Sequence, residues 1–417
     1  MNPKPLVGSL LLATVGVVLL LGLLAPEAAA GTTPPVNLSG SGSWARFAAL
    51  ARAADGTLCA AWSDNRDGAW NIYSACSIHN GQSWGAPGRV ASTSLESIHP
   101  AVLFSGTVPL FFWTDNNSNQ AFTIYQKTGI AVTVEVAVPG ILMPVSRFSV
   151  ARAEDGSLHL VFANWPSADE RTGDIYYTRR PATGEWLSAT VIFTYTFLGS
   201  MDPRIAVGPE GTLHVVWRET LSLSRDEIRY MTGTVGAGGA VTWSPSVTAS
   251  DVVSLAWGPD IAVAPNGNAH IVWTEKSGEN RYLAYARFSA RGERIPPRRL
   301  GGPFSVNQNN PYHLAPAIAA TGERVCIAWN SVPGGASAED VFLICSEDGG
   351  ETWSPPENLS RTPAMSLRPS IAIAPDGSVH VVWQESSGTN YDTDYRVYYT
   401  RWLPHSVYLP LVMRNAR

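Results

Sequence analysis

The sequence is poor in charge, and neither sign dominates it. Only 15% of the 417 residues are Asp, Glu, Lys or Arg, and the formal net charge is −5. An average soluble domain carries about 25% charged residues, and nucleic-acid-binding domains usually show a basic stripe. Lysine is especially scarce, because Lys4, Lys127 and Lys276 are the only ones in the chain. The composition therefore argues against a nucleic-acid partner.

Cysteine and helical patterning are scarce as well. The chain has 4 Cys, and no window shows the spacing of a long amphipathic helix. No group of His, Cys and Asp residues has the spacing of a zinc site, so we expect neither a metal nor a cofactor. What the chain does contain is 37 Gly, 30 Pro and 15 Trp. Such a chain is rich in turns and aromatic residues, as all-β proteins are.

One long apolar run stands at the N-terminus. Residues 6–25 are interrupted only by Ser9 and Thr14, Lys4 precedes them, and small residues follow at 28–30. This pattern is typical of a secretory signal peptide over residues 1–30. The run exceeds the usual hydrophobic region of about 7–15 residues, so an uncleaved membrane anchor is the alternative. In both cases the rest of the chain is expected outside the cytoplasm, secreted or at the cell surface, where disulfides persist.

A repeated unit is the strongest feature of the sequence. Three close copies begin at Pro203 (PRIAVGPEGTLHVVWRE), Pro259 (PDIAVAPNGNAHIVWTE) and Pro369 (PSIAIAPDGSVHVVWQE), and four weaker ones complete the series. Each copy has an apolar run, a turn ending in Gly and an alternating run that ends in an aromatic residue. Two further short runs follow in most units. Four short strands repeated about every 51 residues predict an all-β fold, a seven-bladed β-propeller of four-stranded blades over residues 31–404.

The seventh unit lacks a convincing fourth strand, and the N-terminal segment can supply it. PPVNLS from Pro34 matches PPENLS from Pro355, which is the fourth run of unit six. We therefore expect residues 34–39 to close the last blade, which removes an unpaired sheet edge. The rival is the C-terminal tail, residues 405–417, but Pro410 would interrupt its ladder.

The four cysteines fall at repeated positions. Cys59 and Cys326 each stand three residues before the Trp of their unit, and Cys76 and Cys345 each precede a Ser in the following run. The two runs are expected to be antiparallel neighbours, so we predict the disulfides Cys59–Cys76 and Cys326–Cys345. Of the three connectivities that four cysteines allow, this one respects the repeat.

In four other units, His and Tyr take what we interpret as the same two positions. A functional interpretation would make these histidines metal ligands or bases. We favour a structural cross-strand pair, because a position that also accepts a disulfide is a structural one. The pairs are His159 with Tyr177, His214 with Tyr230, His270 with Tyr285, and His380 with Tyr399.

Residues 346–353 read SEDGGETW and fit the pattern S-x-D-x-G-x-T-W. This segment resembles the Asp-box, or BNR, repeat of sialidase-like propellers, and a degenerate copy, SIHNGQSW, occupies residues 77–84. The resemblance implies a propeller of seven BNR-like repeats. It implies no catalysis at the box, which in that family lies on the face opposite the active site. The defining positions are Ser346, Asp348, Gly350, Thr352 and Trp353.

The resemblance also implies candidate catalytic residues. Sialidases of this family hold a substrate carboxylate with three arginines and use a tyrosine nucleophile with a glutamate partner and an aspartate acid. Arg46 and Arg218 resemble two of the arginines, and Tyr312 resembles the nucleophile. Asp67 resembles the acid, and Asp202 is a stand-in for the glutamate.

Two departures from the family pattern weaken the catalytic interpretation. The third arginine has no match, and Arg368 is the rim arginine that could replace it. The family ring usually has six blades, whereas this chain has seven units. We therefore expect the catalytic groups of units one, four and six not to converge.

A second candidate site is the rim of the central channel. An acid follows the second run in five units, and arginines stand in the expected loops around the same rim. These side chains could bind a ligand, or the acids could cap loop N–H groups. The rim set is Asp64, Asp115, Arg147, Glu219, Glu275, Arg368 and Glu385.

Together these features predict a secreted, sialidase-like propeller. We expect it to bind a glycan or an extracellular protein through its channel rim without catalysing a reaction. An exo-sialidase or a related glycoside hydrolase is the alternative, and a purely structural surface protein is the third interpretation. A membrane partner is expected only if the N-terminal segment stays uncleaved.

Overall fold

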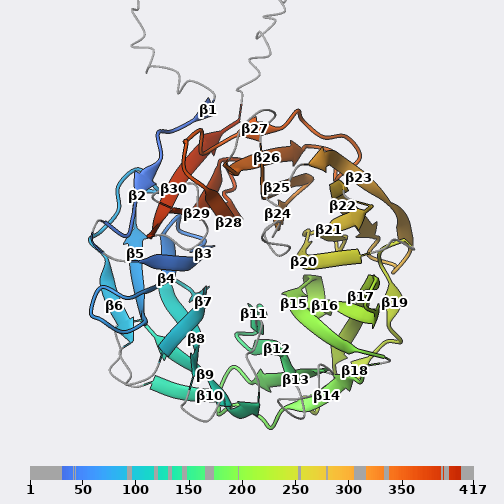
Figure 1. Ribbon diagram of the computed structural model, residues 1–417. Coiled ribbons are helices and arrows are strands. Elements are labelled where there is room, and N and C mark those ends of the chain that lie inside the picture. The colour runs from blue at the N-terminus through green and yellow to red at the C-terminus, as the bar shows by residue number, and fades with distance from the viewer. Residues whose placement is uncertain are drawn as a thin grey trace, which may run out of the picture.

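The computed structural model describes residues 31–40, 42, 44–91, 96–116, 121–129, 134–142, 148–164, 173–195, 197–251, 255–278, 280–304, 316–332, 338–386, 388 and 394–404. The predicted signal segment and C-terminal tail lie outside these residues. Seven antiparallel sheets surround a central axis, in chain order around the ring (Figure 1). The predicted all-β, seven-bladed propeller is confirmed.

Each blade is a meander of strands that runs outward from the axis. The innermost strands are β3 (Ala45–Arg52), β7 (Glu96–Ser105), β11 (Phe148–Arg152), β15 (Gly199–Val207), β20 (Leu255–Val263), β24 (Ala317–Thr321) and β28 (Ser366–Ile373). The second strands are β4 (Leu58–Asp64), β8 (Val108–Asn116), β12 (Leu158–Asn164), β16 (Leu213–Ser222), β21 (Ala269–Ser277), β25 (Arg324–Ser331) and β29 (Val379–Ser386).

The outer half of each blade follows the same order. The third strands are β5 (Asn71–Ser77), β9 (Ala121–Thr128), β13 (Asp174–Arg180), β17 (Arg225–Val235), β22 (Asn280–Phe288), β26 (Asp340–Ser346) and β30 (Tyr395–Leu403). The outermost strands of blades one to six are β6 (Gly88–Ala91), β10 (Val134–Leu142), β14 (Thr190–Phe193), β18 (Val241–Trp243) with β19 (Val247–Thr248), β23 (Arg294–Phe304) and β27 (Glu357–Asn358). One short 3-10 helix, Pro209–Gly211, is the only helical element in the described part of the chain.

The N-terminal segment closes the seventh blade. Strands β1 (Gly31–Thr32) and β2 (Val36–Asn37) both pair antiparallel with β30, and Val36 lies opposite Tyr399. The Leu38 N–H extends the pairing with a bond to the carbonyl of Val397 at 2.8 Å. The prediction that residues 34–39 complete the last blade is confirmed, and the contact starts three residues earlier than expected.

The core lies between neighbouring blades. The aromatic residue that ends the second run of each unit is buried there, with at most 2% of its surface exposed. Burying one such side chain stabilises the fold by roughly 2–3 kcal/mol, so the repeated aromatic position holds adjacent blades together. The seven residues are Trp62, Trp113, Phe162, Trp217, Trp273, Trp329 and Trp383.

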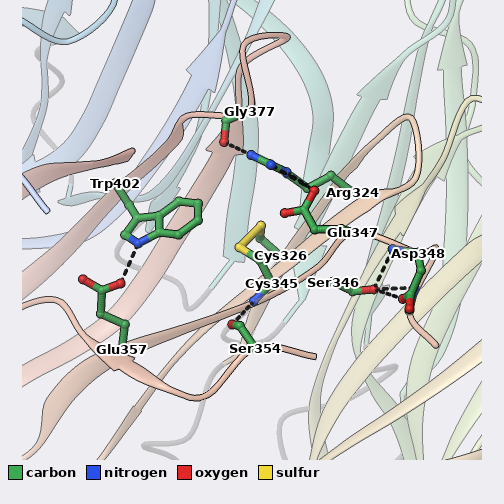
Figure 2. Close-up of a disulfide and its surroundings, with 11 residues drawn as sticks. Arg324, Cys326, Cys345, Ser346, Glu347, Asp348, Ser354, Glu357, Gly377 and Trp402 are labelled. Atoms are coloured by element: carbon green, nitrogen blue, oxygen red, sulfur yellow. Dashed lines mark hydrogen bonds and ion pairs between the residues drawn. A yellow bond between two sulfur atoms is a disulfide. The ribbon is translucent and has the colours of Figure 1, made fainter. Parts of the chain in front are cut away.

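Both predicted disulfides are present, each within one blade. Cys59 lies directly opposite Cys76 on the paired strands β4 and β5, and Cys326 lies opposite Cys345 on β25 and β26. Figure 2 shows the second disulfide, with the Arg324 guanidinium reaching from beside it to the carbonyl of Gly377 in the next blade. The Trp402 indole N–H donates to the Glu357 carboxylate at 2.6 Å, which ties blade seven to blade six.

The four His–Tyr pairs form as cross-strand contacts, with one correction. Each histidine takes the position of the first cysteine, and its Nδ1 lies 2.7–2.8 Å from the tyrosine hydroxyl. The tyrosine, however, stands two residues before the position of the second cysteine. His159 lies opposite Arg179, whereas its partner Tyr177 lies opposite Val161. Two long side chains can meet diagonally across a strand pair, whereas a disulfide needs residues that face each other directly.

Candidate functional site

The inner strands share a backbone irregularity near their first residues. In five blades the strand register skips there, and one residue has φ between 51° and 60°. A residue other than glycine pays about 1–3 kcal/mol for such a conformation, and bulges of this kind gather beside functional sites. These five bulge residues are Phe47, His99, Asp202, Gly258 and Arg368.

The bulge residues define one face of the ring, here called the mouth face. They stand near the beginning of the inner strands, whereas the turns to the second strands follow the other end. The turn that contains Ser346–Trp353, here called the box turn, joins the third and fourth strands. Because successive strands are antiparallel, the box turn lies on the same side as the turns after the inner strands, here called the turn face.

A cavity of about 280 Å³ lies in the channel between the inner strands. Phe47, His99 and Arg368 line it together with Arg204 and Asp260. Arg204 Nε lies 3.6 Å from Asp260, whose carboxylate also accepts a 3.0 Å bond from the Ile318 N–H. The charges of Arg204 and Asp260 therefore offset each other within the channel.

Two arginines from the first and last blades meet at the mouth. The guanidinium carbons of Arg46 and Arg368 each lie 5.0 Å from the centre of the Phe47 ring. Arg46 also lies 3.9 Å from the centre of the Trp70 ring. Among the residues that the structure describes, no carboxylate forms an ion pair with either guanidinium. The Nε atom of Arg46 is buried and has no hydrogen-bond partner among the described residues.

The electrostatics of this pair follow from burial. Desolvation lowers the pKa of Arg368, nearby Arg46 lowers it further, and Tyr395 and Asp202 raise it. Desolvation also lowers the pKa of Arg46, against the opposing effects of Glu96 and Tyr395. Arginine stays protonated in proteins, so the mouth holds two half-buried positive charges that lack a directly bonded anion in the described structure.

Asp202 and Arg218 lie together on blade four. Their closest atoms, Arg218 Nε and Asp202 Oδ2, are 3.8 Å apart, and another Arg218 nitrogen lies 2.7 Å from the Met201 sulfur. Asp202 is close enough to Arg368 to affect its pKa. The structure thus brings Arg46, Arg368 and the Asp202–Arg218 pair to one mouth, although blades one and four are not neighbours.

Asp67, the predicted acid, lies in the loop between β4 and β5 and contacts the outer half of blade one. Asp67 accepts a short hydrogen bond from the Tyr73 hydroxyl, and Arg89 lies 3.1 Å from the same carboxylate. These partners stand on the third and fourth strands of blade one, away from the inner strands that line the cavity. Tyr312 and Arg147 lie outside the described residues.

The five acids of the predicted rim are buried inside their blades. Asp64 accepts a bond from the Trp62 indole at 2.9 Å and one from Arg66 at 3.0 Å. Glu385 accepts from the Trp383 indole at 3.1 Å. These bonds join Asp64 and Glu385 to their own blades, and a direct ligand role for the five acids stays a prediction. Their exposed fractions are 0% for Asp64, 1% for Asp115, 1% for Glu219, 6% for Glu275 and 7% for Glu385.

Sequence reasoning missed several mouth residues. Phe47 packs on the His99 ring with centroids 4.4 Å apart, and Trp70 stacks on Arg46 from the loop before β5. Tyr395 is the first residue of β30, and its electrostatic effect raises the pKa of both Arg46 and Arg368. A signal for the bulge was present, because the bulge residue precedes a proline in four blades. Those prolines are Pro100, Pro203, Pro259 and Pro369.

Two kinds of feature are absent from the described residues: a membrane-spanning helix and a cluster of metal-binding side chains. No helix among the described residues is long and apolar enough to cross a membrane. Nor does the described part of the chain gather three or more His, Cys, Asp or Glu side chains that could hold a metal ion.

Comparison with known proteins places the fold. The sequence matches no protein-family model and no curated protein. Among solved structures, a PL25 ulvan lyase is similar with a TM-score of 0.58 and 12% identity over 87% of this chain and 95% of that one. The polysaccharide lyase Uly1 has a TM-score of 0.54 and 13% identity over 86% and 90% of the two chains. The NanB sialidase of Streptococcus pneumoniae has a TM-score of 0.50 and 12% identity over 89% and 71%. At such identities the likeness shows the propeller fold alone.

Proposed function

We propose that this protein is a secreted, sialidase-like propeller that binds an acidic glycan at the mouth of its channel without catalysing a reaction on it. One observation carries the proposal. Arg46 and Arg368, from the two ends of the propeller sequence, lie on the same aromatic ring and have no ion-paired carboxylate among the described residues.

A carboxylate-bearing sugar supplies what this arrangement lacks. Guanidinium groups present planar forks of N–H donors that match a carboxylate, and bonds between ionised groups are roughly twice as strong as neutral ones. Phe47 and Trp70 add aromatic surface beside the two charges. The cavity of about 280 Å³ has room for the end of a glycan rather than for a folded protein, which favours a glycan over an extracellular protein as the ligand.

Asp67 is the reason for proposing binding rather than hydrolysis. The sialidase mechanism needs an acid that approaches the glycosidic oxygen. Asp67, which matches that acid by sequence position, is bonded to Tyr73 and Arg89 on the outer strands. Without another acid in that role, the mouth would hold an acidic sugar and release it unchanged.

The wider context supports a glycan ligand outside the cytoplasm. NanB is a sialidase, and Uly1 and the ulvan lyase are polysaccharide lyases, so related propellers act on glycans. The box turn has the hydrogen bonds that an Asp-box would need, with Thr352 N–H donating to Asp348 at 2.8 Å. Two disulfides and the apolar N-terminal run fit a secreted protein.

Exo-sialidase activity is the second candidate, and a specific observation favours it. Arg46, Arg368 and the Asp202–Arg218 pair meet at one mouth, where Arg368 would take the place of the unmatched third arginine. In that case Tyr312 would be the nucleophile.

Calorimetric titration with 3′-sialyllactose tests the proposal. We expect binding by the wild type and at least tenfold weaker binding by Arg368→Gln. The matched control is Arg361→Gln, because Arg361 is exposed on the outer part of blade six. Wild-type affinity in Arg368→Gln, or equal losses in both variants, would overturn the proposal. Release of sialic acid by the wild type would promote the second candidate.

A further inference from the structure

A tyrosine from one blade is covered by the next blade at three junctions. Tyr285 meets Trp353 of the box turn with ring centres 5.2 Å apart. Tyr399 meets Trp84 at 4.7 Å, and Tyr177 meets Trp243 at 5.1 Å. At the first two junctions, glycine backbone also covers the tyrosine hydroxyl. Each of these three His–Tyr pairs is therefore closed over by an indole on the turn face.

The junction between blades four and five is built differently. Phe288 takes the strand position that Ser346 has in blade six, and its ring stacks on Tyr230 with centroids 4.2 Å apart. A tight turn follows, closed by the bond from the Gly292 N–H to the Ser289 carbonyl at 2.7 Å. This turn is shorter than the box turn and carries no indole, so Phe288 covers Tyr230 in place of an indole, and His214 and Tyr230 both line a cavity beside the turn.

A cavity of about 430 Å³ lies over this pair. Pro209 and Pro265 form apolar parts of its lining, and Thr212, Thr232 and Asn266 supply hydroxyl and amide groups. Glu210 and Arg291 also line it, so the lining has one charge of each sign. The lining comes from the turns after β15 and β20 and from the turn after β22, so the cavity is on the turn face, separate from the channel mouth.

His214 offers a hydrogen-bonding group to this cavity. Its Nδ1 is 2.7 Å from the Tyr230 hydroxyl, and only 6% of the side chain is exposed. In two of the three closed pairs, Nε2 of His159 and of His380 lies 2.9 and 3.3 Å from the hydroxyls of Ser157 and Ser378. Neither His270 Nε2 nor His214 Nε2 has such a bond among the residues that the structure describes, but His270 Nε2 is buried beneath the box turn, whereas His214 lines the cavity. Burial lowers the pKa of His214 to about 4, so the ring is neutral at neutral pH.

We propose that the cavity between blades four and five is a second binding site that takes a neutral saccharide unit. A sugar hydroxyl can donate to or accept from His214 Nε2 in either tautomer. The apolar face of the sugar ring would lie against Pro209 and Pro265, with other hydroxyls facing Thr212 and Thr232. The mouth, with its two positive charges, and this cavity, whose lining has one acid and one base, would then hold different parts of a glycan, or different glycans, on opposite faces.

Histidine side-chain NMR of the full protein tests this site without relying on the channel mouth. Galactose, glucose and N-acetylglucosamine are added separately, and indole is the aromatic probe. At least one sugar should shift the Nε2 signal of His214, while the signal of His270, in a closed pair, stays unchanged. If no sugar shifts His214, or if indole alone does, the proposal is wrong.

Three variants sharpen the test. Thr232→Trp should fill the cavity and weaken sugar binding at least tenfold. Thr212→Val preserves shape but removes a hydroxyl, so it should weaken binding about threefold even if Thr232→Trp fails to fold. Thr57→Val, at the matching turn position of blade one, should leave the affinity unchanged. Equal affinities for Thr212→Val and Thr57→Val would contradict the site. Arg368→Gln should leave this binding intact, which separates a failure here from a failure at the mouth.

Discussion

The hydroxyl of Tyr285 occupies the space that a side chain on Gly350 would need. The tyrosine comes from blade five and the glycine from the box turn of blade six, and a Cβ on Gly350 would overlap the phenolic oxygen. His270 Nδ1 holds that oxygen from the other side at 2.7 Å. The box turn therefore packs against the tyrosine of the preceding blade. Its glycine and its tryptophan both have a structural role at this junction.

Gly350→Ala should destabilise the fold more than a comparable glycine change does. The residue has φ of +89° and meets Tyr285, so we expect a loss of about 3 kcal/mol in the free energy of unfolding. Gly322→Ala in the same blade is the control. Its φ is +56° and a Cβ would meet nothing within 4 Å, so backbone strain alone should cost about 1 kcal/mol. Equal losses in the free energy of unfolding of the two variants, measured by denaturant titration, would contradict this packing role of the box turn.

The four buried histidines predict a loss of stability in mild acid. Burial lowers the pKa of His159, His214 and His270 to about 4 and that of His380 to about 3. In the unfolded chain these groups take up protons near pH 6.5, so the unfolded state binds more protons below that pH. Stability is then full above pH 6.5 and falls towards pH 4, by about 3 kcal/mol per histidine. Unfolding titrations at pH 7 and 4.5 measure this, and His270→Gln should show a smaller difference than the wild type.

The disulfides should stabilise the protein without defining the fold. They close loops with sequence separations of 17 and 19 residues, for which the chain-entropy account gives about 3 kcal/mol each. Replacing both cysteines of either pair by serine should lower the free energy of unfolding by this amount and leave the far-ultraviolet circular dichroism unchanged. Loss of the β-sheet signal in either double variant would refute this expectation.

The fold was predictable because each unit of the sequence repeat corresponds to one blade of the propeller. The aromatic residue of each second strand and the glycine turn between the first two strands recur at a nearly constant period, and a seven-membered ring follows from their number. The match between Pro34 and Pro355 even located the closing strand. The His–Tyr geometry was predicted only in part, because sequence position does not distinguish a facing partner from a diagonal one.

The candidate site was harder to predict, because a closed ring joins residues that are distant in the chain. Arg46 and Arg368 are separated by most of the sequence and meet only because blade seven adjoins blade one. The acids after the second strands look like an exposed rim in the sequence. The alternating pattern shows that they end a strand, but it does not show that an indole such as that of Trp62 turns back to bind them.

A sialoside assay distinguishes binding from catalysis. We expect purified protein to release no more product from a fluorogenic sialoside than a Tyr312→Phe control does, since Asp67 is bonded to the outer strands of blade one. Turnover that disappears in Tyr312→Phe would show that the protein is a sialidase.

The most direct measurement compares a charged ligand with its neutral form. The affinities of the methyl glycoside of sialic acid and of its methyl ester, which lacks the negative charge, are measured on the wild type and on Arg368→Gln. We expect the wild type to prefer the acid at least tenfold, as a bond between charged groups of about 1.5–3 kcal/mol implies, and Arg368→Gln to lose most of that preference. If the wild type binds acid and ester equally, or if Arg368→Gln keeps the full preference, the two arginines do not form a carboxylate site.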